Sequence, residues 1–354
     1  MKKHIITLLL IITILLLITG CENLIALEGE RVADVNYEGK LVVHFLDVGQ
    51  ADSILIQMPN GTISLIDGGN RGDAKLIIDY IKELNIQRID YLIATHPHED
   101  HIGGLPEIIK SFDIINIYMP KVTASTKIFE SLLTEIQNEG LKIKEGKSGV
   151  DIIAEDGLAY SIIAPNSFEY KETNDFSIVT RLNYKESSFI FTGDAEKPSE
   201  DEMIVKGYDL TAKVLKVGHH GGRTSTSKEF LDKINPDYAV ISVEKGNDYG
   251  HPHKETIKRL QEKGIDILRT DEMGTIVLVS EGNSIAVEGI DKNKNDSVQN
   301  STENLNTYIG NKNTKVYHSD KCSSLPNKEN QIEFNSINEA ENAGYKPHQS
   351  CIDK

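Results

Sequence analysis

Cysteine is scarce in this sequence, and its scarcity limits how the chain can be stabilised. Only Cys21, Cys322 and Cys351 occur among 354 residues. No disulfide framework can hold the central part of the chain, which must rely on a hydrophobic core. At 39% hydrophobic and 26% charged residues, the composition is that of an ordinary globular protein. The length favours a main domain with an appended module.

Positive charge is also scarce. Lys and Arg number 38 against 54 Asp and Glu, which gives a formal net charge of −16. Proteins that gather nucleic acid by long-range attraction usually show a basic footprint, so this balance argues against processive DNA binding. Metal cations in an active site still attract a phosphate locally, so phosphate chemistry is not excluded.

Long apolar runs are absent except near the N-terminus. Lys2 and Lys3 precede an apolar run from residue 5 to 18, which matches the central region of a signal peptide and is shorter than a membrane-spanning helix. The segment from Leu17 to Cys21 resembles a bacterial lipobox. This resemblance implies cleavage before Cys21, lipid on its sulfur, and an extracytoplasmic protein anchored to the cell membrane. An uncleaved signal anchor is the alternative.

Changes of composition divide the chain. We expect a signal peptide at residues 1–20, a spacer at 21–39, the main domain at 40–289, a disordered linker at 290–306 and a small module at 307–354. The linker prediction follows from its Asn, Lys, Ser, Asp and Gln content, which offers almost no apolar surface to bury.

The apolar pattern of the main domain predicts an α/β fold. Three short apolar runs between residues 41 and 66, with Pro59-Asn60-Gly61 as a turn, predict an antiparallel meander. Helical spacing over 74–85 is followed by a buried strand over 89–94. Further strands are expected at 114–118, 160–164, 177–183, 188–192, 212–217, 238–243 and 275–279. This order suggests two mixed sheets packed face to face, with helices outside.

The segment from His96 to His101 has the ligands of a metal site. It reads His-Pro-His-Glu-Asp-His and directly follows the strand predicted at 89–94. In extended backbone His96 and His98 point the same way, and Asp100 and His101 come from the turn beyond. Three imidazoles and one carboxylate at a strand end suit a divalent cation such as zinc.

Two later segments end in similar groups. An apolar strand ends in Thr192-Gly193-Asp194, and another runs into Gly218-His219-His220-Gly221. Asp194 by itself would be an ordinary turn residue. Together with the first cluster, it is better interpreted as a carboxylate that bridges two metal ions.

These motifs resemble the metallo-β-lactamase superfamily and, within it, the extracytoplasmic hydrolase domain of ComEC-type DNA-uptake proteins. The resemblance covers residues 41–287 and implies a four-layer αββα sandwich. It rests on six segments in the right order: Phe45 to Ser53, Leu65 to Gly69, Thr95 to Leu105, Thr192 to Asp194, Leu215 to Gly221, and Tyr249 to Pro252.

The resemblance implies roles for individual residues. His96 and His98 would bind the first metal, Asp100 and His101 the second, and Asp194 both. His219 would complete the second site, with His220 as the alternative if the register differs by one. Asp67 would lie beneath the site and order a ligating histidine.

One departure concerns the first metal. The superfamily usually supplies a third histidine between the first cluster and Asp194, but no histidine occurs from residue 102 to 193. ComEC-type domains have a turn rich in Asn and Asp there, which corresponds to Asn174-Asp175. Asp175 is therefore a candidate ligand.

The implied chemistry is hydrolysis by a metal-bound hydroxide between two cations, zinc or manganese. Asp100, His220 and His251 are the candidate catalytic residues, with His253 as another candidate to stabilise or protonate oxygens. Residues 223–225 could contact phosphate, whereas Thr226 and Glu229 also match a helix capping box, which is the preferred interpretation.

The C-terminal module contains two short chelating pairs. His318 and Cys322 form one, and His348 and Cys351 form the other, which together predict one structural zinc ion. A Cys322–Cys351 disulfide is the alternative. The module resembles the metal-binding module of Ada-type DNA repair proteins, in which four cysteines bind the metal. His318 stands where the methyl acceptor would be, so methyl transfer is not expected.

The leading hypothesis is a cell-surface phosphodiesterase, most specifically a nuclease acting on extracellular DNA in competence. A hydrolase of another phosphoester such as phosphorylcholine, or of a β-lactam-like amide, is the second hypothesis. A metal-containing binding protein without turnover is the third, because of the missing third histidine. The expected partners are DNA or another phosphoester substrate, and the membrane through lipid on Cys21.

Overall fold

The computed structural model describes residues 37–288 and, towards the C-terminus, residues 308–319, 322, 324–334, 340, 343–348 and 351. The predictions for the signal peptide, for Cys21 and for the linker lie outside these residues. The chain divides into two compact units, on either side of the Glu288–Gly289 bond. No helix among the described residues is long and apolar enough to cross a bilayer.

The first unit contains an eight-stranded sheet. Its strand order is β15-β14-β1-β2-β3-β4-β5-β6. The strands are β1 (Leu41–Phe45), β2 (Ile54–Gln57), β3 (Ile63–Ile66), β4 (Arg88–Ile93), β5 (Asp113–Met119), β6 (Ile143–Glu145), β14 (Ile276–Ser280) and β15 (Ile285–Val287). β1, β2 and β3 form the antiparallel meander predicted from the sequence, and β3 to β6 run parallel.

A seven-stranded sheet faces the first one, in the order β13-β12-β11-β10-β9-β8-β7. Its strands are β7 (Val150–Glu155), β8 (Leu158–Ala164), β9 (Val179–Tyr184), β10 (Ser187–Phe191), β11 (Val214–Lys216), β12 (Tyr238–Ile241) and β13 (Asp266–Arg269). β10 to β13 are parallel, whereas β7 to β10 are antiparallel. The rings of Phe45 and Phe191 lie 6.1 Å apart and pack the two sheets together.

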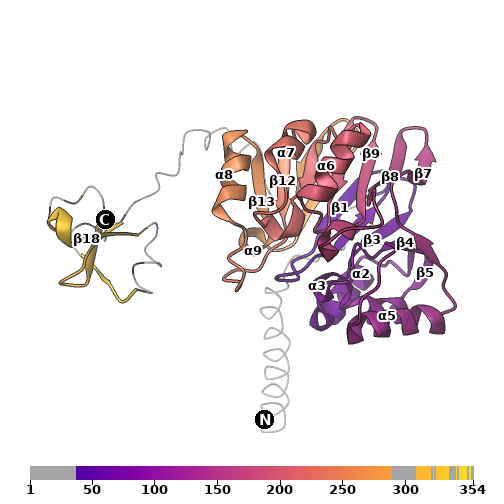
Figure 1. The fold of residues 1–354 in the computed structure, drawn as a ribbon, viewed down its shortest axis with the longest axis horizontal. Coiled ribbons are helices and arrows are strands. Elements are labelled where there is room, and N and C mark those ends of the chain that lie inside the picture. Colours follow the sequence, from indigo (N-terminus) through magenta and orange to yellow (C-terminus); the bar gives the residue numbers. More distant parts are fainter. Residues whose placement is uncertain are drawn as a thin grey trace, which may run out of the picture. The chain divides into compact units, whose positions relative to one another are not determined.

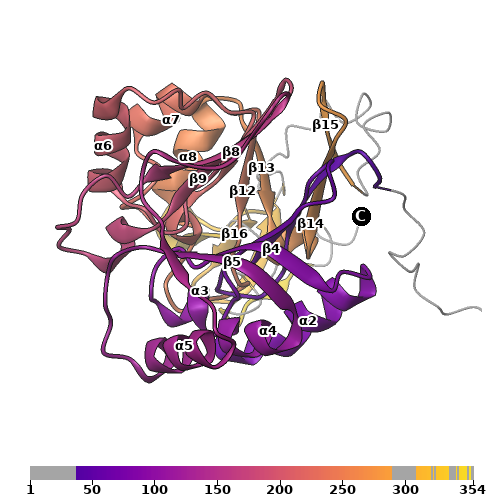
Figure 2. The ribbon, with the colours of Figure 1, turned by 90° about the vertical axis from the view of Figure 1, so that its right-hand side faces the viewer.

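Helices cover the outer face of each sheet. The helices are α2 (Ala74–Glu83), α3 (Glu99–Ile102), α4 (Leu105–Ser111), α5 (Lys127–Asn138), α6 (Lys197–Lys206), α7 (Lys228–Ile234), α8 (Lys254–Glu262) and α9 (Thr270–Met273), with short 3-10 turns η2 (Arg71–Asp73), η3 (Thr173–Phe176) and η4 (Gly218–Gly221). Figure 2 shows α2 to α5 on one side of the paired sheets and α6 to α8 on the other. The predicted αββα sandwich is confirmed.

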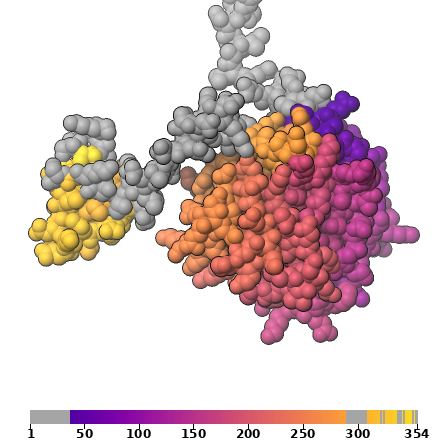
Figure 3. Space-filling view, turned by 90° about the horizontal axis from the view of Figure 1, so that it is seen from above, coloured from indigo at the N-terminus to yellow at the C-terminus, as the bar shows by residue number. Residues whose placement is uncertain are grey.

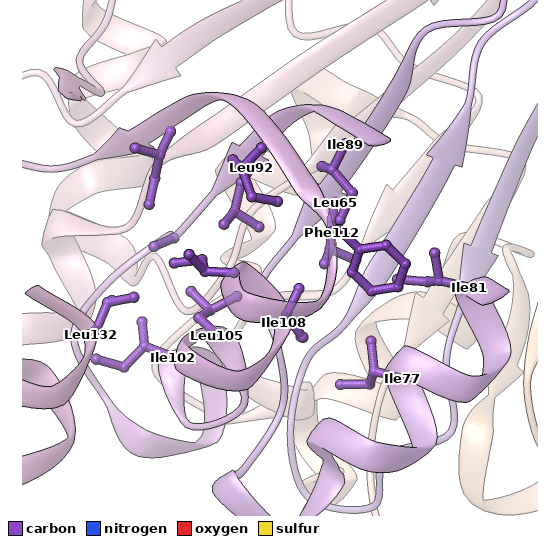
Figure 4. Close-up of a cluster of buried hydrophobic side chains, with 14 of the residues drawn as sticks. Leu65, Ile77, Ile81, Ile89, Leu92, Ile102, Leu105, Ile108, Phe112 and Leu132 are labelled. Atoms are coloured by element: carbon purple, nitrogen blue, oxygen red, sulfur yellow. The ribbon is translucent and has the colours of Figure 1, made fainter. Parts of the chain in front are cut away.

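The outer face of the first sheet is packed by apolar residues that recur at helical spacing. Ile77 and Ile81 of α2 and Ile108 of α4 are buried against Leu65 and Leu92 of the sheet (Figure 4). Each such side chain contributes roughly 1.5–3 kcal/mol when it is fully removed from water. A corresponding cluster, which includes Phe230 and Leu260, lies beneath α6 to α8 on the second sheet.

The parallel strands of both sheets direct their carboxyl ends to the loops that carry the polar motifs. Asp67 follows β3, His96 follows β4, Asp194 follows β10 and His219 follows β11. The backbone N–H of Ile178 donates to the carbonyl of Thr95, which joins the loop after β4 to the second sheet. Residues far apart in the sequence are thus brought to one edge of the sandwich. Figure 1 labels β3 and β4, two of the strands that carry these loops.

The C-terminal unit has a small sheet of its own, in the order β18-β16-β17-β19. Its elements are β16 (Tyr308–Asn311), β17 (Val316–Ser319), η5 (Lys328–Asn330), β18 (Gln331–Phe334) and β19 (Lys346–Pro347). Its buried apolar cluster contains Tyr317, Phe334, Ala340 and Tyr345. Figure 3 shows the described residues of this unit in yellow and those of the first unit from indigo to orange.

Candidate metal centre

The first cluster of ligands lies between β4 and α3. His96 and His98 are on the loop, and Asp100 and His101 are in the single turn of α3. Nε2 of His96 and Nδ1 of His98 lie 3.0 Å apart. Two ring nitrogens that face each other at this distance are placed to bind one cation together.

Asp194 lies between two groups of histidines. Its Oδ2 atom is 3.3 Å from Nε2 of His101 and 3.9 Å from Nε2 of both His96 and His219. Its Oδ1 atom is 3.8 Å from Nε2 of His220. The carboxylate of Asp194 therefore lies within reach of all four histidines, as a bridging ligand requires.

Asp100, His101, Asp194 and His220 place one ligand atom each within 4.8 Å of one another. Oδ2 of Asp100 is 3.7 Å from Nε2 of His101 and 3.3 Å from Nε2 of His220. Atoms bound at about 2 Å to one tetrahedral zinc ion lie roughly 3.3 Å apart. These four side chains thus have the spacing of one metal site.

The geometry favours His220, the alternative named from the sequence, over His219 for the second site. His220 lies with Asp100 and His101, whereas Nε2 of His219 lies 3.9 Å from Oδ2 of Asp194, as Nε2 of His96 does. Both histidines are in the left-handed backbone region, with φ angles of 50° and 52°. Two successive residues in this conformation cost of order 1–3 kcal/mol each, a strain that is typical of functional sites. Here it directs neighbouring side chains towards different parts of the centre.

Hydrogen bonds fix which ring nitrogen faces the centre. Nδ1 of His101 donates to Oδ2 of Asp67 at 2.7 Å, and Nδ1 of His220 donates to the carbonyl of Ser242 at 3.0 Å. Nδ1 of His219 lies 3.1 Å from a carboxylate oxygen of Glu196. In each ring Nε2 then carries the lone pair, and a carboxylate or carbonyl behind the ring is the usual support of a metal-binding histidine.

Two hydrogen bonds from Thr95 hold the carboxylate of Asp67 in place. Its Oδ1 accepts from the backbone N–H of Thr95 at 2.8 Å, and its Oδ2 accepts from the Thr95 hydroxyl at 2.7 Å. The structure thus places Asp67 where the resemblance puts it, beneath the site and behind His101.

Two buried atoms of the centre have no hydrogen-bond partner in the part of the chain that the structure describes. They are Nε2 of His101 and Oδ1 of Asp194. An unpaired buried acceptor is costly, and a cation would satisfy both atoms. Together with the ligand spacing, these atoms show that the residues fit bound metal.

The charges of the centre are strongly coupled. Burial would raise the pKa of Asp194, but His101 and His220 lower it well below its ordinary value. Burial would likewise lower the pKa of His101, but the carboxylates of Asp194, Asp100 and Asp67 raise it well above its ordinary value. For His96, burial and the neighbouring His101 both act to lower the pKa. The carboxylates are therefore held ionised, the form that binds metal.

Asp175 is not placed as a ligand, which corrects the expectation from the sequence. Its Oδ1 accepts the backbone N–H groups of Glu196 and Ser199, at 3.2 and 3.3 Å, at the start of α6. Burial raises the pKa of Asp175 to about 6. Its neighbour Asn174 lines the metal pocket instead and donates to Glu196 at 3.2 Å.

A buried ion pair lies beneath the centre and was not anticipated from the sequence. Nζ of Lys216, at the end of β11, contacts Oδ2 of Asp52, and both side chains are almost inaccessible to solvent. Oδ1 of Asp52 is 3.6 Å from Nδ1 of His220. Asp52 belongs to a motif that carries the resemblance, but nothing in the apolar pattern of β11 indicated a partner for it.

The metal centre opens into a cavity of about 340 Å³ lined by Gln50, Asn174, Tyr249 and His251 among others. Gln50 accepts from the N–H of Glu244 through Oε1, so its amide donates to Nδ1 of His251 at 3.3 Å. The proton of His251 is then on Nε2. Burial, with His219 and His220 nearby, lowers the pKa of His251 to about 4, so the ring is neutral.

The hydroxyls after His220 have structural partners. Thr224 donates to Glu196 at 2.8 Å and Ser225 to the carbonyl of Gly218 at 2.7 Å. The capping box predicted at Thr226 is wrong, because the cap of α7 is Ser227, whose hydroxyl accepts from the N–H of Phe230.

Comparison with known proteins agrees with this geometry. Residues 46–244, more than half of the chain, match the family described as the Metallo-beta-lactamase superfamily. The chain belongs to the metallo-β-lactamase superfamily.

Several curated proteins are similar to its hydrolase domain. ComE operon protein 3 of Bacillus subtilis is 33% identical over 251 residues, which cover 66% of this chain and 32% of that protein. Competence protein ComA of Neisseria gonorrhoeae is 28% identical over 248 residues, and Recombination protein 2 of Haemophilus influenzae is 30% identical over 222 residues. This chain spans about a third or less of the length of these relatives.

Solved structures of the superfamily are also similar. The metallo-β-lactamase fold protein YhfI from Bacillus subtilis is 12% identical with a TM-score of 0.44, covering 70% of this chain and 99% of that one. Zinc-bound PqqB from Methylobacterium extorquens is 10% identical with a TM-score of 0.43, covering 65% and 97%.

The C-terminal unit brings its predicted ligands together. His318, Cys322, His348 and Cys351 place one ligand atom each within 4.8 Å of one another, and both cysteines are free thiols. Nδ1 of His348 is 3.3 Å from Sγ of Cys351 and 3.7 Å from Sγ of Cys322. Residues 296–353 match the family described as Metal binding domain of Ada. The unit therefore contains a metal-binding group of two histidines and two cysteines rather than a disulfide.

Proposed function

We propose that this superfamily hydrolase is a two-metal phosphodiesterase that acts as a nuclease on extracellular DNA. One observation carries the hydrolytic part of this proposal. Histidines whose Nδ1 atoms are held by hydrogen bonds direct their Nε2 atoms towards the ionised Asp194. Oδ1 of Asp194 and Nε2 of His101 have no hydrogen-bond partner among the described residues. Two cations bound by such a centre would supply the chemistry of a two-metal hydrolase.

We assign the ligands from the geometry. His96, His98 and His219 would bind one ion, Asp100, His101 and His220 would bind another, and Asp194 would contribute to both. His219 would thereby take the role of the third histidine that the sequence lacks between residues 102 and 193. Glu196 supports this role because it holds Nδ1 of His219 and leaves Nε2 free.

Two divalent cations supply an activated water and neutralise charge on the phosphoryl oxygens. The protein's own groups then orient the reaction. Asp100 lines the cavity, and its carboxylate accepts a hydrogen bond from the attacking water. His251 is neutral with its proton on Nε2, so it donates to the leaving oxygen. Nε2 of His220 and Oδ2 of Asp100, 3.3 Å apart, would bind the same ion and so hold Asp100 in position.

DNA as the substrate is supported by association. The relatives include proteins named for competence and recombination, and the motifs resemble ComEC-type DNA-uptake proteins. The lipobox-like segment ending at Cys21 supports a location outside the cytoplasm, on the membrane surface. DNA in the surroundings of the cell is the phosphodiester that such an enzyme would meet.

The test uses the full chain, purified in detergent and loaded with zinc or manganese. We expect cleavage of DNA and of bis-p-nitrophenyl phosphate, with both activities lost in Asp194→Ala and Asp100→Ala. Cleavage of the small ester without cleavage of DNA would replace the nuclease by a hydrolase of another phosphoester. A fully loaded protein without turnover on either substrate, or on a β-lactam, would favour a metal-containing binding protein.

A further inference from the structure

We propose that Tyr249 and Arg223 form a nucleotide subsite beside the metal centre, in which Tyr249 stacks on a base and Arg223 binds the neighbouring phosphate. The inference rests on the proposed nuclease function and adds the residues that would select one strand of DNA over a duplex.

Tyr249 is an exposed aromatic at the mouth of the metal cavity. Its side chain is 68% exposed, yet its ring lies nearly parallel to that of His251, at 24° and a centroid distance of 5.8 Å. It lines the metal cavity and also a neighbouring groove of about 590 Å³. An aromatic ring in this position, partly uncovered and next to the reacting centre, can stack on any base.

The loop that carries Tyr249 is held in shape. Oδ1 of Asn247 accepts the backbone N–H groups of Tyr249 and His251, at 3.1 and 3.0 Å. Its amide donates to the carbonyls of Glu244 and His251, at 2.9 and 2.7 Å. The ring is therefore presented by an ordered loop, so stacking does not require the loop to be ordered first.

The groove on the far side of Tyr249 repels phosphate. Its lining includes the carboxylates of Asp47, Asp73, Glu99 and Glu244 and contains neither Lys nor Arg. Uncharged bases suit such a wall, because carboxylates accept hydrogen bonds from base amino groups. The backbone of a second strand does not, because its phosphates would face like charges.

Arg223 provides a cation beside His253, whose ring neighbours that of His251. It is exposed, and its Nη2 donates to Nε2 of His253 at 3.0 Å. The rings of His253 and His251 lie 4.8 Å apart. Within the described part of the chain no carboxylate is in ion-pair reach of Arg223, unlike Arg181 and Arg269. The other N–H groups of its guanidinium are available to bind a phosphate.

Because the net charge of −16 offers no long-range attraction, these local contacts should decide how DNA binds. In a single strand, one base can stack on Tyr249 while the neighbouring phosphate binds Arg223. A duplex keeps that base stacked inside the helix and brings its second backbone towards the acidic groove.

The experiment compares a fluorescein-labelled oligonucleotide of mixed sequence with the same oligonucleotide in a duplex, using the metal-loaded full chain. We expect a lower KM for the single strand. Tyr249→Leu should raise that KM roughly tenfold, the loss of one stacked base, while Tyr249→Phe stays near wild type. Phe168→Leu, an exposed aromatic that lines neither cavity, is the control.

Arg223→Gln should have a different signature. The slope of log affinity against log salt concentration, measured by fluorescence anisotropy, should fall by about 0.7 for one lost phosphate contact. Tyr249→Leu should leave the slope unchanged, and so should Lys142→Gln, which removes an exposed charge that lines neither cavity.

Equal KM values for single strand and duplex, or an unchanged KM in Tyr249→Leu, would overturn the subsite while leaving the nuclease intact. If the loaded protein cleaves no phosphodiester, the proposed function fails. Fluorescence anisotropy then still tests the subsite through oligonucleotide binding. The subsite proposal holds only if Tyr249→Leu weakens binding of the single strand and Phe168→Leu does not.

Discussion

At the scale of single residues, the ion pair of Lys216 and Asp52 is the feature of the site whose stability depends most on both partners being present. Both groups are buried, and the pair lies against His220. Removing one partner leaves an uncompensated charge in the interior, which is far more costly than removing both. The pair therefore fixes the position of His220 from beneath the metal centre.

Lys216→Met should lower the free energy of unfolding by about 3–5 kcal/mol. Urea unfolding at neutral pH in the presence of a chelator measures this without a contribution from metal binding. The double variant Lys216→Met with Asp52→Asn should recover most of the loss. A single variant that costs less than about 1 kcal/mol would show that the pair is not an anchor.

Asp67 gives a second prediction for a single residue. Asp67→Asn keeps the size of the side chain but weakens the acceptor behind Nδ1 of His101. Loss of such a support typically lowers metal affinity about 10–100-fold. Competition with a chelator of known affinity measures the change. An affinity equal to wild type would mean that the packing around His101 is enough to orient its ring.

The sequence could indicate these candidate ligands because their spacing depends on local chain geometry. His96 and His98 alternate along an extended segment, and Asp194 ends an apolar strand. The separate roles of His219 and His220 depend on two left-handed residues in succession, which no pattern of apolar residues reveals. Lys216 was hidden for a similar reason, since its partner comes from a distant segment.

At the scale of elements, α6 shows how a carboxylate near the centre can serve the fold alone. Asp175 accepts two backbone N–H groups at the start of this helix. Asp175→Ala should therefore cost about 1 kcal/mol of stability, the usual value of an N-terminal cap. Elemental analysis should find the same metal content as in wild type, whereas Asp194→Ala loses metal. Loss of metal in Asp175→Ala would restore this residue as a ligand.

The contact of β1 with β2 and α2 contains a buried histidine that makes stability depend on pH. The amide of Gln57 lies 2.9 Å from Nε2 of His44, and the hydroxyl of Tyr80 lies 2.8 Å from Nδ1. Burial lowers the pKa of His44 from its ordinary value of 6.5 to about 3. Below pH 6.5 the unfolded chain therefore binds a proton that the folded chain does not.

The resulting stabilisation is complete above pH 6.5 and is lost as the pH falls towards 3. The free energy of unfolding should drop by up to about 1.4 kcal/mol per pH unit through this group. Urea unfolding of wild type and His44→Gln at several pH values, with chelator present, measures the contribution of His44 to the pH dependence of stability. Parallel curves for the two proteins would contradict the prediction.

The elements that the sequence indicated are those with strong apolar patterns. All three strands of the meander and the buried parallel strands are where the pattern placed them. β6, β7, β13 and β15 were not anticipated. They lie at or next to the edges of the sheets, where exposed positions weaken the apolar pattern, as the fully exposed β6 shows.

At the scale of the whole molecule, the chain consists of two units that are stabilised by different means. The first unit has extensive apolar clusters on the outer faces of both sheets. The C-terminal unit buries only a few aromatic and small side chains. A segment of this size rarely folds on its core alone, so the ligands His318, Cys322, His348 and Cys351 must supply the rest through a bound metal.

Cys351→Ser should remove about one zinc ion per chain and unfold the C-terminal unit only. Calorimetry of the wild type should show two transitions, and the variant should keep the one that belongs to the hydrolase unit at an unchanged temperature. Hydrolysis of bis-p-nitrophenyl phosphate should also be unchanged, because none of the ligands of the main centre comes from this unit. Ser324→Ala, which changes an exposed hydroxyl of the same unit, is the control. If the variant instead lowers the transition temperature of the hydrolase unit, the two units depend on each other for stability, and the metal of the small unit then supports the whole enzyme.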